Sequence, residues 1–181
     1  VWFGYWVSIV LPTADVASST RESYEDLCAW YLIPRLGRIR LVKLSPADVR
    51  GMLVSMSADG YSSNTQRLAR AALRRALRVA EAESYVQRNV AGLTDGVKLD
   101  TKIGRTMTPD QMKCLISSVS GNRIEPVLHV LLATGLRRSE VLGLCWSDID
   151  LIASPATIQV SHALKREKSG LVFGEPKTRR T

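Results

Sequence analysis

The sequence predicts an all-α domain followed by a second domain of mixed α and β structure, and three observations lead to this expectation. Apolar residues recur at helical spacing over residues 1–96 without a strand pattern. Residues 97–107 are polar and basic and show no clear periodicity. Residues that favour β-strands alternate only beyond Asp150. We therefore expect a helical bundle over 1–96, a linker over 97–107 and a mixed domain over 108–181.

Three helices are predicted before residue 62. The first has four large apolar residues at spacings of three to four, which predicts a face toward the core: Trp2, Tyr5, Trp6 and Ile9. Pro12 and the small residues that follow it should end this helix. A capping box that begins at Ser19 starts the second helix, and Pro34 and Gly37 should end it. Ser45 followed by Pro46 is a typical start for the third.

The fourth predicted helix, over residues 64–83, separates an apolar face from a basic one. Five residues of the apolar face should be buried: Ala69, Leu73, Ala76, Leu77 and Ala80. The opposite face carries four arginines: Arg67, Arg70, Arg74 and Arg78. They extend over a rise of about 16 Å, which is comparable with the spacing of several backbone phosphates. This row could follow a DNA strand, and a solvated charged face is the alternative.

The second domain should begin with further helices. Thr108-Pro109-Asp110-Gln111 is another capping-box start. A helix over 124–134 should stop at Gly135, and a short helix over 138–144 should follow. Trp146 should lie in the core, because Leu142, Leu144 and Ile149 give its surroundings in the sequence an apolar character; a platform for base stacking is the alternative.

The end of the chain has the pattern of a β-hairpin. Residues 157–160 and 171–173 favour strands, and a turn signal occupies 168–170. The second strand should run toward Lys177.

Composition and charge limit the classes of function. The chain has 181 residues, 45% hydrophobic and 23% charged, which is typical of a folded globular protein and excludes a disordered or collagen-like one. Its 25 lysines and arginines exceed its 17 acidic residues and give a formal net charge of +8. The excess favours a polyanionic partner, above all nucleic acid, although charge that only maintains solubility is the alternative.

The cysteines and histidines indicate neither a disulfide framework nor a metal site. Cys28, Cys114 and Cys145 are odd in number and far apart, and the two histidines are isolated. We therefore expect a cytoplasmic protein without a bound metal. No stretch approaches the roughly 20 apolar residues that span a bilayer, so no membrane association is expected. The chain begins with Val1 and not methionine, which suggests a processed, engineered or incomplete chain.

One stretch of the second domain carries a specific motif. Leu132-Ala133-Thr134-Gly135-Leu136-Arg137-Arg138-Ser139-Glu140 is followed closely by Leu144-Cys145-Trp146-Ser147-Asp148-Ile149-Asp150. In register, this run resembles the phage-integrase tyrosine recombinases. The resemblance continues through Ser63-Asn64-Thr65, Arg88-Asn89 and Pro176-Lys177-Thr178. It implies a SAM-like core-binding bundle in front of the first part of a mixed α+β catalytic domain.

The resemblance also implies roles for individual residues. Arg137 corresponds to the first catalytic arginine of the family, and Lys177 to the lysine on a β-hairpin that acts as the general acid. Glu140 would orient Arg137, with a simple ion pair on the helix surface as the alternative. Arg138 would contact a phosphate, and Thr65 would contact DNA together with the four arginines of the basic helix.

These residue types suit the cleavage of a phosphodiester. Attack on phosphorus builds negative charge on its oxygens, which the planar and permanently charged guanidinium of Arg137 can hold with two hydrogen bonds. Losing one such charge stabiliser typically costs about 3 to 4 kcal/mol of barrier. Lys177 would give a proton to the departing 5′ oxygen, a step worth about 10²- to 10⁴-fold in rate.

The chain lacks the other catalytic groups that the resemblance implies, namely a His-x-x-Arg, a further histidine or tryptophan, and a late tyrosine nucleophile. No tyrosine follows Tyr85, and Lys165 stands three residues after His162 where the arginine would be. We therefore expect that the catalytic domain is incomplete and that this chain alone does not cleave DNA.

Two hypotheses of function follow. The first is a fragment of a site-specific recombinase that cuts and rejoins double-stranded DNA through a phosphotyrosyl intermediate. The resemblance implies that such an enzyme needs neither metal nor nucleotide and that its intact form is a tetramer on two DNA sites. The second is a DNA-binding module that occupies recombination sites without cutting. A helix-turn-helix regulator is a third reading, but it would leave Arg137 and Lys177 unexplained.

Overall fold

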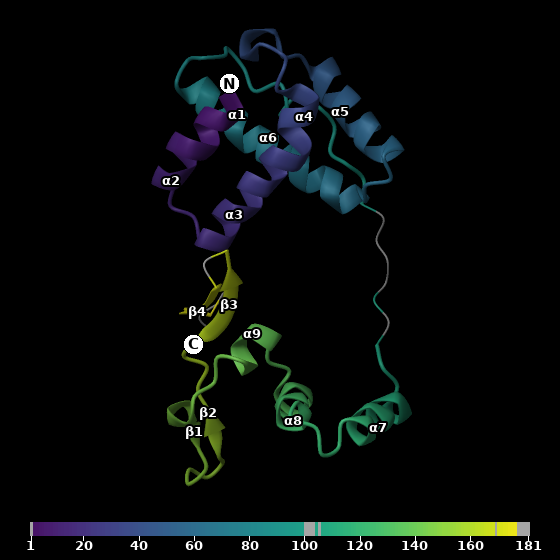
Figure 1. The fold of residues 1–181 in the computed structure, drawn as a ribbon, viewed down its shortest axis with the longest axis vertical. Coiled ribbons are helices and arrows are strands. Elements are labelled where there is room, and N and C mark those ends of the chain that lie inside the picture. Colours follow the sequence, from purple (N-terminus) through teal and green to yellow (C-terminus); the bar gives the residue numbers. More distant parts are fainter. Residues whose placement is uncertain (1, 100–103, 105, 169, 177–181) are drawn as a thin grey trace. The chain divides into compact units, whose positions relative to one another are not determined.

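The computed structural model describes residues 2–99, 104, 106–168 and 170–176, and Figure 1 shows its elements along the chain. The chain divides into two compact units, Val1–Lys102 (unit 1) and Ile103–Thr181 (unit 2). The described part of unit 1 is helical, and that of unit 2 combines short helices with two antiparallel strand pairs. This agrees with the expected order of a helical and a mixed region. No helix of the described residues has the length and apolar character needed to cross a bilayer.

The first helical segment of unit 1 runs without interruption through α1 (Trp2–Tyr5), η1 (Trp6–Val10) and α2 (Leu11–Thr13). The helix ends where it was predicted to end, at Thr13, one residue after Pro12, and Pro12 itself lies in the last turn. A proline in a helix lacks an N–H donor, and its ring collides with the carbonyl four residues earlier. Here η1 is a π-helical turn in which the Leu11 N–H donates to the Trp6 carbonyl five residues back, and this wider turn accommodates the ring.

The π-helical turn also changes which face of this segment is buried. Phe3, Trp6 and Leu11 lie in the core, whereas Tyr5 and Ile9 are exposed. The expected core face was therefore only partly right. An ideal helical period does not hold across a turn that contains an additional residue.

The second helical segment also contains a π-helical turn directly before a proline. It consists of α3 (Ser18–Leu27), η2 (Cys28–Leu32) and α4 (Ile33–Leu36). The Ile33 N–H donates to the Cys28 carbonyl five residues back, so Pro34 fits into the last turn, and the helix ends at Leu36 with Gly37 as its C-cap, as predicted. The predicted start is wrong. The N-cap residue is Ala17, which makes no side-chain cap bond, and the helix begins one residue before Ser19.

The next two helices follow the sequence prediction closely. After the short turn η3 (Leu41–Lys43), helix α5 (Pro46–Ala58) begins with a full capping box between Ser45 and Asp48. Helix α6 (Ser63–Ala82) starts at the N-cap Ser62, whose hydroxyl accepts from the Thr65 N–H. The five apolar residues predicted for its inner face are all buried.

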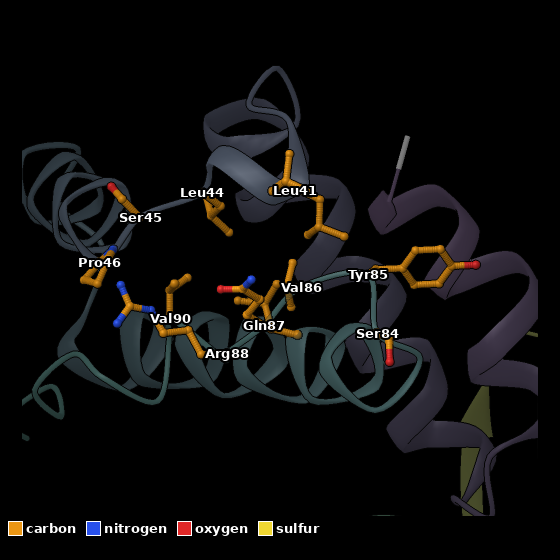
Figure 2. A pocket seen from close by; sticks show the side chains of 12 residues that line it. Leu41, Leu44, Ser45, Pro46, Ser84, Tyr85, Val86, Gln87, Arg88 and Val90 are labelled. Atoms are coloured by element: carbon orange, nitrogen blue, oxygen red, sulfur yellow. The ribbon is translucent and has the colours of Figure 1, made fainter.

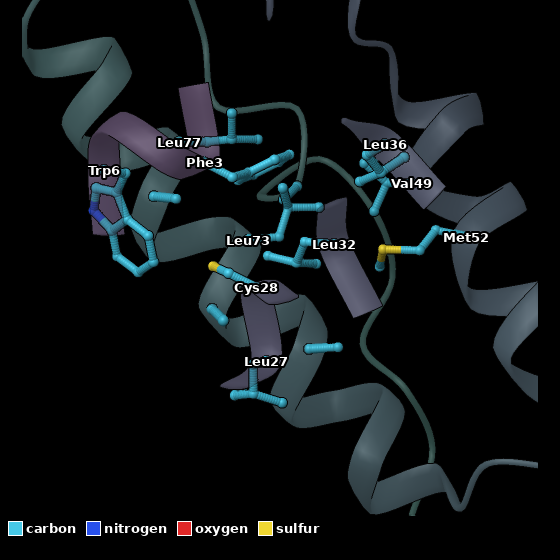
Figure 3. Close-up of a cluster of buried hydrophobic side chains, with 14 of the residues drawn as sticks. Phe3, Trp6, Leu27, Cys28, Leu32, Leu36, Val49, Met52, Leu73 and Leu77 are labelled. Carbon is cyan, nitrogen blue, oxygen red and sulfur yellow. The ribbon is translucent and has the colours of Figure 1, made fainter. Parts of the chain in front are cut away.

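The core of unit 1 forms where these helices meet. Figure 3 shows part of the buried cluster, with Trp6 from η1, Cys28 and Leu32 from η2, and Leu73 from α6. Small alanines on α6 let the neighbouring helices approach its backbone closely. The buried cluster positions α6 so that its opposite face points away from the core.

Unit 2 begins with three helices. Helix α7 (Pro109–Ser118) has the predicted capping box between Thr108 and Gln111. Helix α8 (Glu125–Thr134) ends as predicted at Gly135, whose φ of 66° is a left-handed conformation that glycine adopts without strain. Helix α9 (Arg138–Val141) is shorter than the predicted 138–144, because residues 142–143 form a turn.

Four short strands complete the described part of unit 2. Strand β1 (Ile149–Asp150) pairs with β2 (Thr157–Ile158), and β3 (Ala163–Glu167) pairs with β4 (Gly170–Gly174), both antiparallel. A hairpin around 168–170 was predicted and is present, but its first strand is β3 and not 157–160. The alternation of β-formers identified strand-forming residues but did not reveal their partners.

The described apolar residues of unit 2 are mostly half-buried or exposed. Among its described residues, only Val141 and Ala163 are buried hydrophobics. Trp146 is 85% exposed, so the expectation that it belongs to the core is wrong. It begins the 3₁₀ turn η4 (Trp146–Asp148), and the residue of that turn that points inward is Asp148.

Candidate functional site

Arg137 lies at the start of α9, immediately beyond the turn at Gly135. Its backbone N–H donates to Glu140 Oε2 at 2.9 Å, and its guanidinium Nη1 donates to Glu140 Oε1 at 2.8 Å. Both carboxylate oxygens of Glu140 therefore accept hydrogen bonds from Arg137, one from its backbone and one from its side chain. The Glu140 residue is 7% exposed, whereas the Arg137 side chain is 55% exposed. The geometry fixes a cation at the surface through a buried anion.

This arrangement is chemically suited to hold an anion. A guanidinium that is already oriented loses little conformational freedom when it binds two oxygens of a phosphate. The arrangement goes beyond an ion pair between two exposed side chains, because Glu140 is buried and also caps the helix. The role of Glu140 in orienting Arg137 nevertheless stays a prediction.

Two other predicted residues belong to the same part of the chain. Arg138 is exposed on the first turn of α9, next to Arg137. Lys177 lies outside the described residues. In sequence it follows β4 by three residues, since that strand ends at Gly174.

The basic face of α6 is divided in the structure. Arg67, Arg74 and Arg78 are exposed, as a surface that contacts DNA would require. Arg70 is half-buried instead, and its guanidinium donates to Thr94, with 3.0 Å between Nε and Oγ1 and a further bond from Nη2 to the carbonyl. The expectation that all four arginines face outward as one row is therefore wrong. Arg70 lies where the apolar and basic faces meet.

The residues that engage this face come from the segment after α6. Asn89 Nδ2 donates to the carbonyl of Arg74 at 2.8 Å, and the Asn89 N–H donates to Glu81 Oε1 at 3.1 Å. Thr94 is buried and donates its hydroxyl to the carbonyl of Ala91. Sequence reasoning gave Asn89 and Thr94 no contact with α6, since pairing over such distances leaves no local signal.

Thr65 occupies the first turn of α6. Its hydroxyl lies 2.9 Å from the Ser62 hydroxyl, and its N–H donates to the same oxygen at 3.1 Å. Arg67 is close by, with a guanidinium bond of 3.0 Å to Asn64 Oδ1. The start of α6 thus combines hydroxyl, amide and guanidinium groups that can all hydrogen-bond to phosphate.

The pockets of the structure lie apart from these residues. Figure 2 shows a pocket of about 450 Å³ in unit 1 that is lined by Leu44, Ser45, Tyr85 and Arg88 among others. None of the predicted site residues lines it. In the part of the chain that the structure describes, no three or more His, Cys, Asp and Glu side chains gather where they could hold a metal ion.

Asp148 is a buried residue to which sequence reasoning gave no role. Its carboxylate accepts from the Cys145 backbone N–H at 2.8 Å and from the hydroxyl of Ser161. These two hydrogen bonds, and the neighbouring His162, lower the pKa of Asp148 below its ordinary value. A signal was present in the Leu-x-Trp-x-Asp spacing, but the spacing alone did not indicate what the aspartate contacts.

No family model matches the chain, although individual proteins do. It is 28% identical over 151 residues to an integrase of Streptomyces ambofaciens, which covers 83% of this chain and 38% of that protein. It is 31% identical over 145 residues to the tyrosine recombinase XerC of Roseiflexus castenholzii, covering 77% and 46%. It is 28% identical over 116 residues to XerD of Yersinia pestis, covering 61% and 39%. The chain is thus similar to proteins named tyrosine recombinase and integrase, which supports the tyrosine recombinase/integrase family.

Solved structures of tyrosine recombinases have the same fold. The integrase of transposon Tn1549, in complex with transposon right end DNA, superposes with a TM-score of 0.82 at 25% identity over 98% of this chain and 58% of that one. A lambda integrase dimer bound to a COC′ core site gives 0.71 at 18% identity over 96% and 47%. The chain spans less than half the length of the curated tyrosine recombinases named above.

Proposed function

We propose that this chain is part of a site-specific DNA recombinase that cuts and rejoins double-stranded DNA through a phosphotyrosyl intermediate. The observation that carries the proposal is the pair of Arg137 and Glu140, an exposed guanidinium fixed by a buried carboxylate. In this role Arg137 binds the scissile phosphate and stabilises the negative charge that develops on its oxygens. Glu140 orients Arg137, and Arg138 contacts a neighbouring phosphate.

The second catalytic group of the proposal is Lys177. It would donate its proton to the departing 5′ oxygen after a nucleophile has attacked phosphorus, so that the leaving group departs as a neutral hydroxyl. The support for this role is its Pro-Lys-Thr setting and its place in sequence directly after the β3–β4 pair.

DNA binding by unit 1 is the third part of the proposal. Arg67, Arg74, Arg78 and Thr65 would contact the phosphate backbone along α6 and at its start. The Tn1549 and lambda integrases, whose structures contain DNA, support this assignment. A helical DNA-binding domain over 1–96 with SAM-like topology, a linker over 97–107 and a catalytic region over 108–181 remain the proposed organisation.

The assembly and cellular location are also proposals. A lambda integrase tetramer bound to a Holliday junction supports a tetramer on two DNA sites for the intact enzyme. A reducing cytoplasm suits the free cysteines, of which Cys28 is buried.

The 181 residues by themselves should bind DNA without cleaving it. They contain no tyrosine after Tyr85 and no arginine three residues after His162. Without the nucleophile the covalent step has no attacking atom. The loss in cleavage rate is therefore far greater than the acceleration that the remaining catalytic groups can supply. The same observation favours the second candidate function, a module that occupies recombination sites without cutting.

One experiment separates the two candidates. The DNA that follows the Thr181 codon is sequenced, and the protein encoded by any open frame is incubated with a nicked duplex that traps covalent adducts. A frame with His-x-x-Arg and a late tyrosine, and an adduct that disappears in Arg137→Ala, are expected for the recombinase. A stop codon after Thr181, with duplex binding intact, would instead establish the non-cleaving module. A longer protein that forms no adduct would refute the recombinase proposal.

A further inference from the structure

Helix α9 packs against strand β3 in unit 2. This junction contains Val141 and Ala163, the buried hydrophobics of the described residues of this unit. Glu140 and Asp148, its buried acidic residues, lie close by in the sequence. This junction connects α9, at whose start Arg137 lies, to the β3–β4 pair, which precedes Lys177 in the sequence.

Gly143 brings two backbone segments into direct contact at this junction. A Cβ atom at this position would lie 2.8 Å from the carbonyl oxygen of His162 and 2.9 Å from both Ala163 Cα and Leu164 N. These neighbours are backbone atoms at the beginning of β3, so they cannot rotate away as a side chain would. Glycine is therefore required by the close approach of the chain, and not by an unusual backbone angle.

Asp148 links the same two segments by hydrogen bonds. Its carboxylate accepts from the Cys145 N–H on one side and from the Ser161 hydroxyl on the other. Its backbone carbonyl accepts from the Gln159 N–H at 2.8 Å. Asp148 thus connects the turn that follows α9 with residues 159–162, which lead from β2 to β3.

We infer that Gly143 and Asp148 are positioning residues that fix the β3–β4 pair against α9. The pair is short and has exposed residues on β4, so its own cross-strand contacts hold it only weakly. Contact with α9 fixes the position of the β3–β4 pair relative to this helix. The chain then enters the Lys177 segment from a defined place relative to Arg137, which is what a general acid needs to meet the oxygen that leaves phosphorus.

This inference rests on the proposed function for the role of Lys177, but its test does not. Amide hydrogen exchange is measured on the 181-residue chain without DNA, in variants Asp148→Asn, Ser161→Ala and Gly143→Ala. The β3–β4 amides should exchange about ten-fold faster or more in each variant, while the α8 amides should change by less than about two-fold. Ser161→Thr keeps the hydroxyl and should restore the slow exchange that Ser161→Ala loses.

The matched controls are Asp150→Asn and Gly51→Ala. The Asp150 side chain accepts only from nearby backbone N–H groups of Ile152 and Ala153 among the bonds described, and a Cβ on Gly51 meets no atom within 4 Å. Neither control should change exchange in β3–β4. Uniform acceleration throughout unit 2 would show that the two residues only add stability, and unchanged exchange would show that they hold nothing; either result overturns the inference. If the unsubstituted chain does not bind DNA, the proposed function is refuted, whereas the hydrogen-exchange test of Gly143 and Asp148 remains valid.

Discussion

At the scale of single residues, chemically similar side chains on α6 have different surroundings. Arg70 and Arg74 are one helical turn apart, yet Arg70 binds Thr94 whereas Arg74 is exposed. The difference follows from helix geometry, because Arg70 lies at the edge of the apolar face and meets the segment that packs there. Arginines that recur on one helix face in a sequence are therefore not all equally available to contact DNA.

We expect the salt dependence of DNA binding to distinguish these arginines. Arg67→Gln, Arg74→Gln and Arg78→Gln should each reduce the slope of log K against log salt by about one unit, because each removes a phosphate contact. Arg70→Gln should leave the slope unchanged, since its guanidinium is bound to Thr94. Fluorescence anisotropy with a labelled duplex measures these slopes, and Arg50→Gln on α5 is the control. A loss of one unit in Arg70→Gln would contradict its assignment as an internal anchor.

Thiol reactivity should differ among the three cysteines. Burial raises the pKa of the Cys28 thiol to about 12, whereas Cys114 and Cys145 are exposed. Because the thiolate is the reactive form, a thiol reagent at pH 8 should modify Cys114 and Cys145 in the native chain and Cys28 only after denaturation. Mass spectrometry of the labelled peptides gives the result. Rapid labelling of Cys28 in the native chain would show that the core of unit 1 opens readily.

At the scale of elements, helix caps and helix ends were predicted better than the turns inside the helices. The N-cap at Ser45 and the capping box at Thr108 form as predicted, because the bonds involve residues only three positions apart. The helices that contain Pro12 and Pro34 end near these prolines, at Thr13 and Leu36, but the π-helical turn before each proline was not predicted. Such a turn depends on how both flanking halves of the helix pack, which a local pattern does not contain.

Removal of the Ser45 cap should destabilise unit 1 moderately. Ser45→Ala loses the hydroxyl that accepts from the Asp48 N–H at the start of α5. Loss of an N-cap side chain typically costs about 1 kcal/mol of stability. Urea unfolding followed by far-UV circular dichroism measures the change, and Ser57→Ala near the end of the same helix serves as the control. Equal stability of the two variants would argue against the cap.

Acid should weaken the turns that Asp48 and Asp148 cap. Hydrogen bonds from Ser45 lower the pKa of Asp48, and those from Cys145 and Ser161 lower that of Asp148. A carboxylate with a lowered folded-state pKa contributes stability above its unfolded value, and this contribution is lost as the pH falls through the folded value. Urea midpoints should therefore fall as the pH decreases below about 4. Asp48→Asn and Asp148→Asn should each reduce this dependence, and an unchanged pH profile would contradict it.

At the scale of the whole molecule, the two units differ in how much apolar surface they bury. Unit 1 has a continuous cluster that extends from Phe3 to Ala91, whereas the buried hydrophobics described in unit 2 are Val141 and Ala163. Because burial of apolar surface is the main stabilising contribution in folding, unit 1 should be the more stable of the two.

Limited proteolysis should reveal this difference. Trypsin should cut within residues 97–107, which contain Lys98, Lys102 and Arg105, and leave an N-terminal fragment that resists further digestion. This fragment should keep its helical circular dichroism and bind duplex DNA more weakly than the whole chain, since it lacks Arg137 and Arg138. Fragments from residues 108–181 should be degraded faster. Faster digestion of the N-terminal fragment would contradict the greater stability of unit 1.

The sequence alone determined the helices of unit 1, the caps at Ser45 and Thr108, the turn at Gly135 and the family motif around Arg137. Each of these depends on residues a few positions apart, where spacing and side-chain chemistry settle the geometry. Only the tertiary structure decided that Arg70 binds Thr94, that β3 is the partner of β4, and that Trp146 is exposed while Asp148 is buried. Those outcomes depend on segments that meet through folding, and packing between distant segments can override the local preference of any single residue.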